Sequence, residues 1–196
     1  MIFSVLVKIF PYSMVTAYTP GPNNILALNT TSNFGMRKGA KTLLGISLGF
    51  ICVMLITAGA TFAISSYIPA FVGIMKYIGV AYIVWLAVHI ALSKPETSNN
   101  KKQPGFMEGF LLQFVNVKII LYAVTIYTGY VLPTNKSFIF LMLFAGILSI
   151  IGMSGTMAWA VLGNVMQRFI HRYYRAFHII MALILLESAY GILTAR

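Results

Sequence analysis

The hydrophobic positions of this chain gather into long runs that short polar segments separate. A helix that crosses a bilayer needs about 20 predominantly apolar residues, and by that measure the sequence predicts six spans. They cover residues 3–28, 42–65, 69–92, 106–131, 137–163 and 175–194. The expected fold class is therefore an all-α integral membrane protein with six transmembrane helices, and the whole chain, 1–196, is predicted to be one transmembrane domain.

One polar segment falls inside the first run, where a spanning helix should be most regular. It reads Thr19-Pro20-Gly21-Pro22-Asn23-Asn24. Each proline removes a helical hydrogen bond and clashes with the preceding turn, and it drives the residue before it away from the α region. The break predicts stranded carbonyls near Thr16 to Tyr18 and free amides at a new helix start. In a membrane such groups survive only inside protein or along a polar cavity, so the break is a candidate site.

A hydrophilic linker, residues 94–105, divides the chain into a first half, 1–93, and a second half, 106–196. Each half holds three predicted spans, and because three is an odd number the second half enters the membrane from the opposite side. Inverted repeats of this kind are common in transporters, whose sites lie near the midplane at corresponding interrupted segments. The sequence therefore predicts a second polar segment in the first span of the second half.

That span does carry polar residues in an otherwise apolar run, namely Gln113, Asn116 and Lys118. A lysine at the centre of a span costs about 2.5 to 3.5 kcal/mol on translocon scales, so a polar surrounding and a partner are expected for Lys118. Glu187 is the matching acidic residue in the last span. Two hypotheses stay open for it: a pair with Lys118, or a change of protonation during transport.

The break also predicts the chemistry of its ligand. A half-helix that starts near Pro22 points its positive end and its free amides toward the midplane, which suits a carboxylate. The carbonyls stranded before the break suit an ammonium group. A zwitterion would satisfy both ends, with hydrogen bonds from Asn23, Asn24, Gln113 and Asn116. The simpler interpretation is a kink whose backbone groups are satisfied by neighbouring helices.

Composition supports a membrane protein. The chain is 59% hydrophobic and 9% charged, against roughly 25% charged residues in soluble domains. Its formal net charge of +11 falls in short clusters between apolar runs, which is typical of cytoplasmic loops and disfavours nucleic-acid binding. The clustered residues are Arg37, Lys38, Lys41, Lys94, Lys101, Lys102, Arg168, Arg172 and Arg175. The positive-inside rule then predicts both termini on the periplasmic side.

Small residues spaced three or four positions apart predict close helix packing. Gly35, Gly39, Gly45 and Gly49 lead into the second predicted span, and Gly152, Gly155 and Ala158 lie in the fifth. We expect a packing role for these residues rather than a part in ligand binding.

The sequence gives little support for an enzymatic function. Gly152-Met153-Ser154-Gly155 matches the GxSG motif of rhomboid-type intramembrane proteases, with His178 as a later histidine, but the serine falls in the fifth predicted span instead of the fourth. The chain contains no Asp, which excludes paired-aspartate proteases. His89 and His178 have no ligand-type neighbours at metal-binding spacing, so neither a metal nor a cofactor is expected. A rhomboid-like protease and a non-transporting membrane scaffold stay as alternatives to a transporter.

The segment TPGPNNILAL, Thr19 to Leu28, resembles the signature of the lysine-exporter and homoserine/threonine-resistance superfamily of small bacterial amino-acid effluxers. The segments SLGF (47–50), AYIVWLA (81–87) and QFVNVKIILYAVT (113–125) extend this resemblance over nearly the whole chain. It implies a secondary exporter of the bacterial inner membrane, coupled to protons, for small neutral amino acids or derivatives such as cysteine or O-acetylserine. The implied partners are this substrate, protons and the lipid bilayer, with no nucleic acid; a homodimer is left open.

The candidate binding residues combine this resemblance with the pattern of the sequence. They are Thr19, Pro20, Gly21, Pro22, Asn23, Asn24, Gln113, Asn116 and Lys118. The broader superfamily has Asn-Pro-Lys where this chain has Asn116-Val117-Lys118, so the second break is expected to be lost together with its proline. Glu187 is a further departure from the family pattern and is the candidate for coupling.

Overall fold

The computed structural model describes residues 2–64, 68–92 and 103–194. Within these ranges the chain is helical apart from short connections, and it contains no strand. The first half forms α1 (Ile2–Tyr18), α2 (Pro22–Ile64) and α3 (Ile68–Leu92). The second half forms α4 (Phe106–Val115), α5 (Val117–Ile126), a π-helical turn η1 (Tyr127–Val131), α6 (Leu132–Thr134), α7 (Phe138–Val165), α8 (Gln167–Arg172) and α9 (Tyr174–Thr194). Most of the predicted linker, with Lys94, Lys101 and Lys102, lies outside the described residues, as does Arg196.

The described residues contain three helical stretches that are long and apolar enough to cross a membrane. These are Pro22–Ala63, Val117–Thr134 and Phe138–Val165. The helix breaks shorten α1 and α4 to 17 and 10 residues, whereas the unbroken helices α3 and α9 have 25 and 21 residues. The all-helical membrane architecture is thus confirmed, while the count of six stays a prediction.

The predicted loop between the first two spans is wrong, because residues 29–41 are helical except at one position. Gly35 adopts φ 80° and ψ 165°, which turns the chain between the two parts of α2. A residue with a side chain is strained at such a positive φ, which is why glycine is suited to this position. The carboxamide oxygen of Asn164 accepts the next backbone N–H, that of Met36, at 3.0 Å.

The predicted glycine contacts are confirmed where α2 meets the second half. A Cβ at Gly49 would lie 2.6 Å from Gln113 Cγ, and one at Gly152 would lie 2.8 Å from a carbon of the Phe50 ring. A Cβ at Gly155 would lie 2.7 Å from the carbonyl carbon of Ala17. Close approach at these glycines sets the spacing of α2 from α4, and of α7 from α1 and α2. Ala158, by contrast, is exposed.

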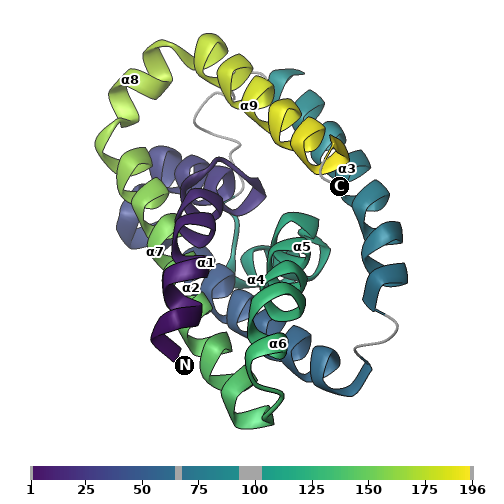
Figure 1. The fold of residues 1–196 in the computed structure, drawn as a ribbon. Helices are drawn as coiled ribbons and strands as arrows, with labels where there is room; N and C mark the ends of the chain where they lie inside the picture. The colour runs from purple at the N-terminus through teal and green to yellow at the C-terminus, as the bar shows by residue number, and fades with distance from the viewer. Residues whose placement is uncertain (1, 65–67, 93–102, 195–196) are drawn as a thin grey trace.

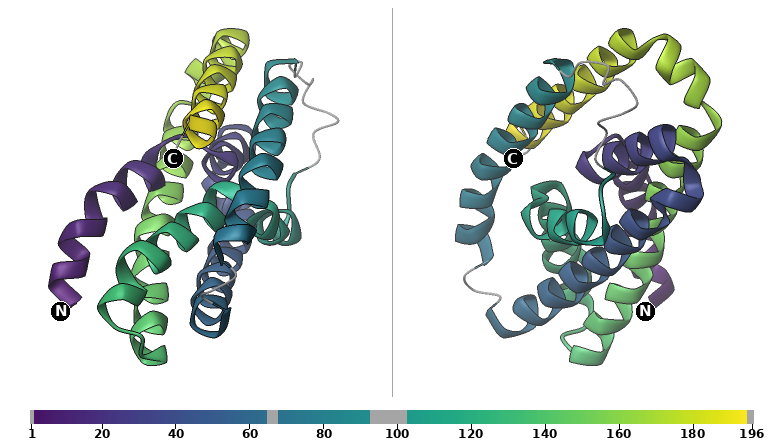
Figure 2. Two further views of the ribbon diagram at one scale, coloured as in Figure 1. Left: turned by 45° about the vertical axis from the view of Figure 1, so that its right-hand side comes forward. Right: turned by 180° about the vertical axis from the view of Figure 1, so that it is seen from behind.

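The two halves of the chain pack against each other through corresponding helices. Helix α4 packs on α2, α1 packs on α7, and the long helices α2 and α7 pack on each other. Helices α3 and α9 pair along the outside of the bundle, as Figure 1 and the right view of Figure 2 show. Each broken segment therefore lies against the long helix of the other half. This is the contact pattern that an inverted repeat would produce.

Candidate functional site between two helix breaks

Both halves are broken, which corrects one expectation from the sequence. The first break, at Thr19 to Gly21, separates α1 from α2 as predicted. The second was expected to be lost with its proline, yet the chain leaves the helix at Asn116, where φ is −80° and ψ is 89°. The carbonyl of Asn116 then accepts the N–H groups of Ile119 and Ile120 and so starts α5. A tertiary contact holds the break open without proline, because Asn116 Nδ2 donates to Asn23 Oδ1 at 2.9 Å.

Three buried amides connect the two breaks. Asn23 Nδ2 donates to Gln113 Oε1 at 2.6 Å, and Gln113 Nε2 donates back to Asn23 Oδ1 at 2.9 Å. Gln113 Nε2 also donates to the backbone carbonyl of Gly109 at 2.9 Å. Asn23, Gln113 and Asn116 are 6%, 0% and 2% exposed. Buried amides of this kind specify one arrangement when their hydrogen bonds are made.

The stranded carbonyls of the first break already have donors, which corrects a second expectation. Lys118 Nζ lies 3.0 Å from the Thr19 carbonyl oxygen and 3.4 Å from that of Pro20. Asn24 Nδ2 donates to the carbonyls of Ala17 and Thr19, each at 2.9 Å. The carbonyls predicted to receive a ligand ammonium were those near Thr16 to Tyr18. In this conformation the Ala17 carbonyl accepts from Asn24, and Lys118 donates to the next two carbonyls along the chain, those of Thr19 and Pro20.

Trp159 provides another such donor, since its indole N–H donates to the Tyr18 carbonyl at 3.0 Å. The neighbouring Tyr18 hydroxyl donates to Ser154 Oγ at 3.3 Å, and Ser154 donates to the Ile151 carbonyl at 2.7 Å. The candidate serine of the protease hypothesis thus belongs to the hydrogen-bonded wall beside the first break. His178 lies on α9, where its Nδ1 is 2.8 Å from the carbonyl oxygen of Tyr174 on the same helix.

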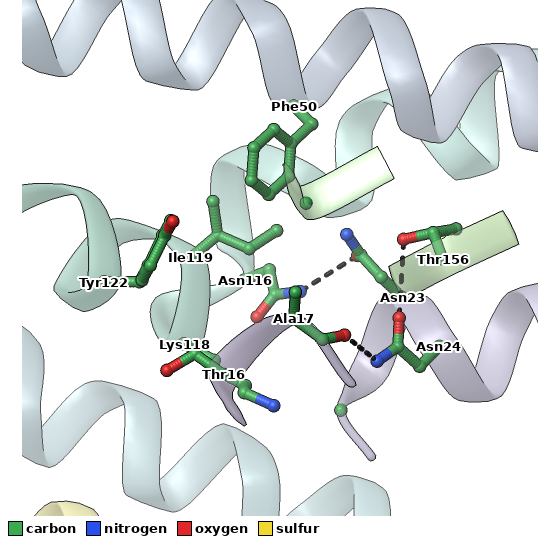
Figure 3. A pocket seen from close by; sticks show the side chains of 12 residues that line it. Thr16, Ala17, Asn23, Asn24, Phe50, Asn116, Lys118, Ile119, Tyr122 and Thr156 are labelled. Atoms are coloured by element: carbon green, nitrogen blue, oxygen red, sulfur yellow. Dashed lines mark hydrogen bonds between the residues drawn. The ribbon is translucent and has the colours of Figure 1, made fainter. Parts of the chain in front are cut away.

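A cavity with about 410 Å³ of empty space, part of it open, lies between the breaks. Its lining residues are Thr16, Ala17, Gly21, Asn23, Asn24, Phe50, Asn116, Lys118, Ile119, Tyr122, Gly152 and Thr156. Figure 3 shows Phe50, Ile119 and Tyr122 as one wall and the Asn24–Thr156 contact at the opposite end. The site combines a cationic and amide surface with an apolar wall.

Five of the nine candidate residues line the cavity: Gly21, Asn23, Asn24, Asn116 and Lys118. Thr19 and Pro20 contribute carbonyls, Pro22 is the first residue of α2, and Gln113 lies behind Asn23. Sequence reasoning missed Thr16, Phe50, Tyr122, Gly152 and Thr156. They belong to apolar helices in which nothing distinguishes them from packing residues until the helices are assembled.

The remaining charged and metal-type residues lie elsewhere. Glu187 is exposed on α9 and does not line the cavity, and the hydrogen bonds of Lys118 within the described residues go to carbonyl oxygens. Glu108 accepts the backbone N–H of Gly105 at 2.9 Å at the start of α4. In the described part of the chain, no three His, Cys, Asp or Glu residues gather as metal ligands would.

The chain is similar to known proteins over nearly its whole length. The family model described as "LysE type translocator" matches residues 14–194. The chain is similar to the cysteine/O-acetylserine efflux proteins of Escherichia coli strain K12, Escherichia coli O139:H28 (strain E24377A / ETEC) and Shigella sonnei strain Ss046. Each is 41% identical over 187 residues, covering 95% of this chain and 96% of the relative. No solved structure matches the chain.

Proposed function

This chain belongs to the LysE type translocator family, and from that premise we propose that it exports small neutral amino acids or their derivatives. Cysteine and O-acetylserine are the first substrates to test, because the similar proteins are named for their efflux. The family and these relatives are transporters and not enzymes, so the protease hypothesis based on Ser154 and His178 is set aside. The scaffold alternative predicts no flux and is tested below.

The observation that carries this proposal is the cavity between the two helix breaks. It brings one ammonium, that of Lys118, together with amides and hydroxyls beside an apolar wall. An ammonium has three N–H donors, and the Thr19 and Pro20 carbonyls use two of them. The third is free for a carboxylate. A zwitterion with a small uncharged side chain therefore suits the site.

We assign substrate binding to the nine residues predicted from the sequence, with Lys118 as the contact to the carboxylate. Alternating access follows if the two halves are inverted repeats, because rocking of one half against the other would open the cavity to either side. We further propose six spans in the bacterial inner membrane with both termini periplasmic, on the distribution of basic residues. Proton coupling completes the proposal, with Glu187 as the candidate group outside the cavity.

Counterflow in proteoliposomes tests the function directly. The purified protein is reconstituted with each of a panel of unlabelled amino acids inside, and uptake of the same labelled compound is followed. We expect uptake of cysteine, O-acetylserine or a similar small neutral amino acid, and none of arginine or glutamate. Absence of substrate-dependent flux for the whole panel would favour the scaffold alternative.

A further inference from the structure

One buried acceptor in the cavity has no hydrogen-bond partner among the described residues. It is Oδ1 of Asn116, a residue that is 2% exposed. The other end of the same carboxamide donates to Asn23 Oδ1. Buried polar atoms in folded proteins are nearly always paired, so an unpaired acceptor that lines a cavity indicates a donor brought by a ligand.

The orientation of this carboxamide follows from a backbone group. The carbonyl of Gly109 can only accept, which fixes the neighbouring atom of Gln113 as Nε2. Gln113 Nε2 in turn requires Oδ1 of Asn23 opposite it, and Asn23 Oδ1 requires Nδ2 of Asn116. Reversing any one amide would place two donors or two acceptors face to face. The free atom of Asn116 is therefore the acceptor.

A second buried polar group lies in the same cavity. The hydroxyl oxygen of Tyr122 is buried, with the Ser13 hydroxyl as its neighbour, and the side chain is 4% exposed. Asn116 immediately precedes α5, Tyr122 is the sixth residue of that helix, and both line the cavity with Lys118 (Figure 3). The hydroxyl of Tyr122 can accept a hydrogen bond, so the two side chains offer two acceptors to one ligand group.

We propose that Asn116 Oδ1 and the Tyr122 hydroxyl form the subsite for the α-ammonium of the transported amino acid. The inference rests on the proposed function, which it makes more specific. It moves the ammonium away from the Thr19 and Pro20 carbonyls, which Lys118 already fills. The substrate then lies along the start of α5, with its carboxylate at Lys118 and its ammonium at Asn116 and Tyr122.

Three related thiols test recognition of the substrate ammonium and of its carboxylate separately. L-cysteine carries both charged groups, 3-mercaptopropionate lacks the ammonium, and cysteamine lacks the carboxylate. Each competes with labelled cysteine in counterflow under reducing conditions, and the ratio of inhibition constants measures discrimination. The wild-type protein should prefer cysteine to both analogues.

Asn116→Leu should reduce the preference for cysteine over 3-mercaptopropionate by about 10- to 100-fold, the size expected for a lost hydrogen bond to a charged group. Its preference for cysteine over cysteamine should stay. Lys118→Met should instead reduce the preference for cysteine over cysteamine and keep the preference for cysteine over 3-mercaptopropionate. If Asn116→Leu does not reach the membrane folded, Tyr122→Phe provides the same test. It should reduce the preference for cysteine over 3-mercaptopropionate several-fold.

The control is Tyr127→Phe in η1, because Tyr127 is also buried but its hydroxyl bonds to the Leu141 carbonyl and the residue does not line the cavity. Its discrimination should equal that of the wild type. An unchanged preference against 3-mercaptopropionate in folded Asn116→Leu, or in Tyr122→Phe where that variant carries the test, would overturn the subsite while leaving the exporter in place. A wild-type protein that transports no amino acid would overturn the proposed function and the subsite with it.

Discussion

The ammonium of Lys118 lies 3.0 Å from the carbonyl oxygen of Thr19, although 99 positions separate the two residues in the chain. Lys118 is the second residue of α5, and Asn23 is the second residue of α2. Asn23 reaches Gln113 and Asn116 beside the other break. The second residue of each half-helix thus bonds to the opposite break, and any movement of one half against the other must exchange these hydrogen bonds.

Two residues that maintain the first helix break, Asn24 and Pro20, should be required for transport. Asn24→Ala removes the donor to the Ala17 and Thr19 carbonyls, and an unsatisfied buried carbonyl costs about 1 to 3 kcal/mol. Pro20→Ala restores a backbone N–H and lets the helix close over the break. We expect both variants to insert normally and to lose cysteine counterflow.

The control for these variants is Asn33→Ala, which removes an exposed asparagine from the same helix. It should transport at the wild-type rate. Retained transport in both Asn24→Ala and Pro20→Ala would contradict the assignment of the site to this break.

The packing of α2 on α4 should depend on Gly49. A Cβ there would lie 2.6 Å from both Gln113 Cγ and the Phe110 carbonyl oxygen. Overpacking of this kind typically destabilises by about 1 to 3 kcal/mol. Gly49→Ala should lower the melting temperature in detergent, whereas Gly59→Ala, whose Cβ would meet nothing within 4 Å, should not. Equal melting temperatures for the two variants would show that α4 can move away from α2 freely.

Hydrophobic periodicity and proline chemistry predict much of this fold, because they act locally. The break at Pro20 to Pro22 and the long apolar helix α7 follow from neighbouring residues alone. The break at Asn116 does not, since no proline enforces it and the Asn23 side chain that stabilises it lies 93 positions away. The helical course of residues 29–41 was missed for a similar reason: a single glycine, Gly35, makes the turn.

The residues of the candidate site, too, could be predicted only in part from the sequence. Lys118 and Asn116 are conspicuous in the sequence because polar residues are costly in a membrane. Phe50 and Gly152 are ordinary apolar and small residues, and only the packing of α2 on α7 brings them to the cavity. The prediction that backbone carbonyls bind the ligand ammonium did not take into account that, in this conformation, Asn24 and Lys118 donate to carbonyls of the first break.

Glu187 should affect coupling and leave recognition unchanged. Its side chain is exposed on α9 and does not line the cavity, so it cannot contact the substrate in this conformation. Glu187→Gln removes the ionisable carboxyl group and should flatten the pH dependence of counterflow and efflux. The preference for cysteine over its two analogues should be that of the wild type. An unaltered pH dependence would remove Glu187 from the mechanism.

Gly152 and Phe50 should set the size of the substrate side chain. Both line the cavity, and a Cβ at Gly152 would lie 2.8 Å from a carbon of the Phe50 ring. Gly152→Ala must therefore push the ring toward the cavity and narrow its apolar wall, whereas Phe50→Ala must widen it. We expect Gly152→Ala to lose the larger substrate O-acetylserine before cysteine. Phe50→Ala should transport larger uncharged amino acids such as methionine faster, relative to cysteine, than the wild type does.

The matched control for this prediction is Gly146→Ala on the same helix, where an added Cβ would meet nothing within 4 Å. It should keep the substrate profile of the wild type. The ratio of counterflow rates for cysteine, O-acetylserine and methionine measures the effect independently of the amount of folded protein. Because Gly152→Ala and Phe50→Ala change the cavity in opposite directions, their ratios should move in opposite directions from the wild type. A parallel change in both variants would mean that they act through stability, and that the wall formed by Phe50 does not select the substrate.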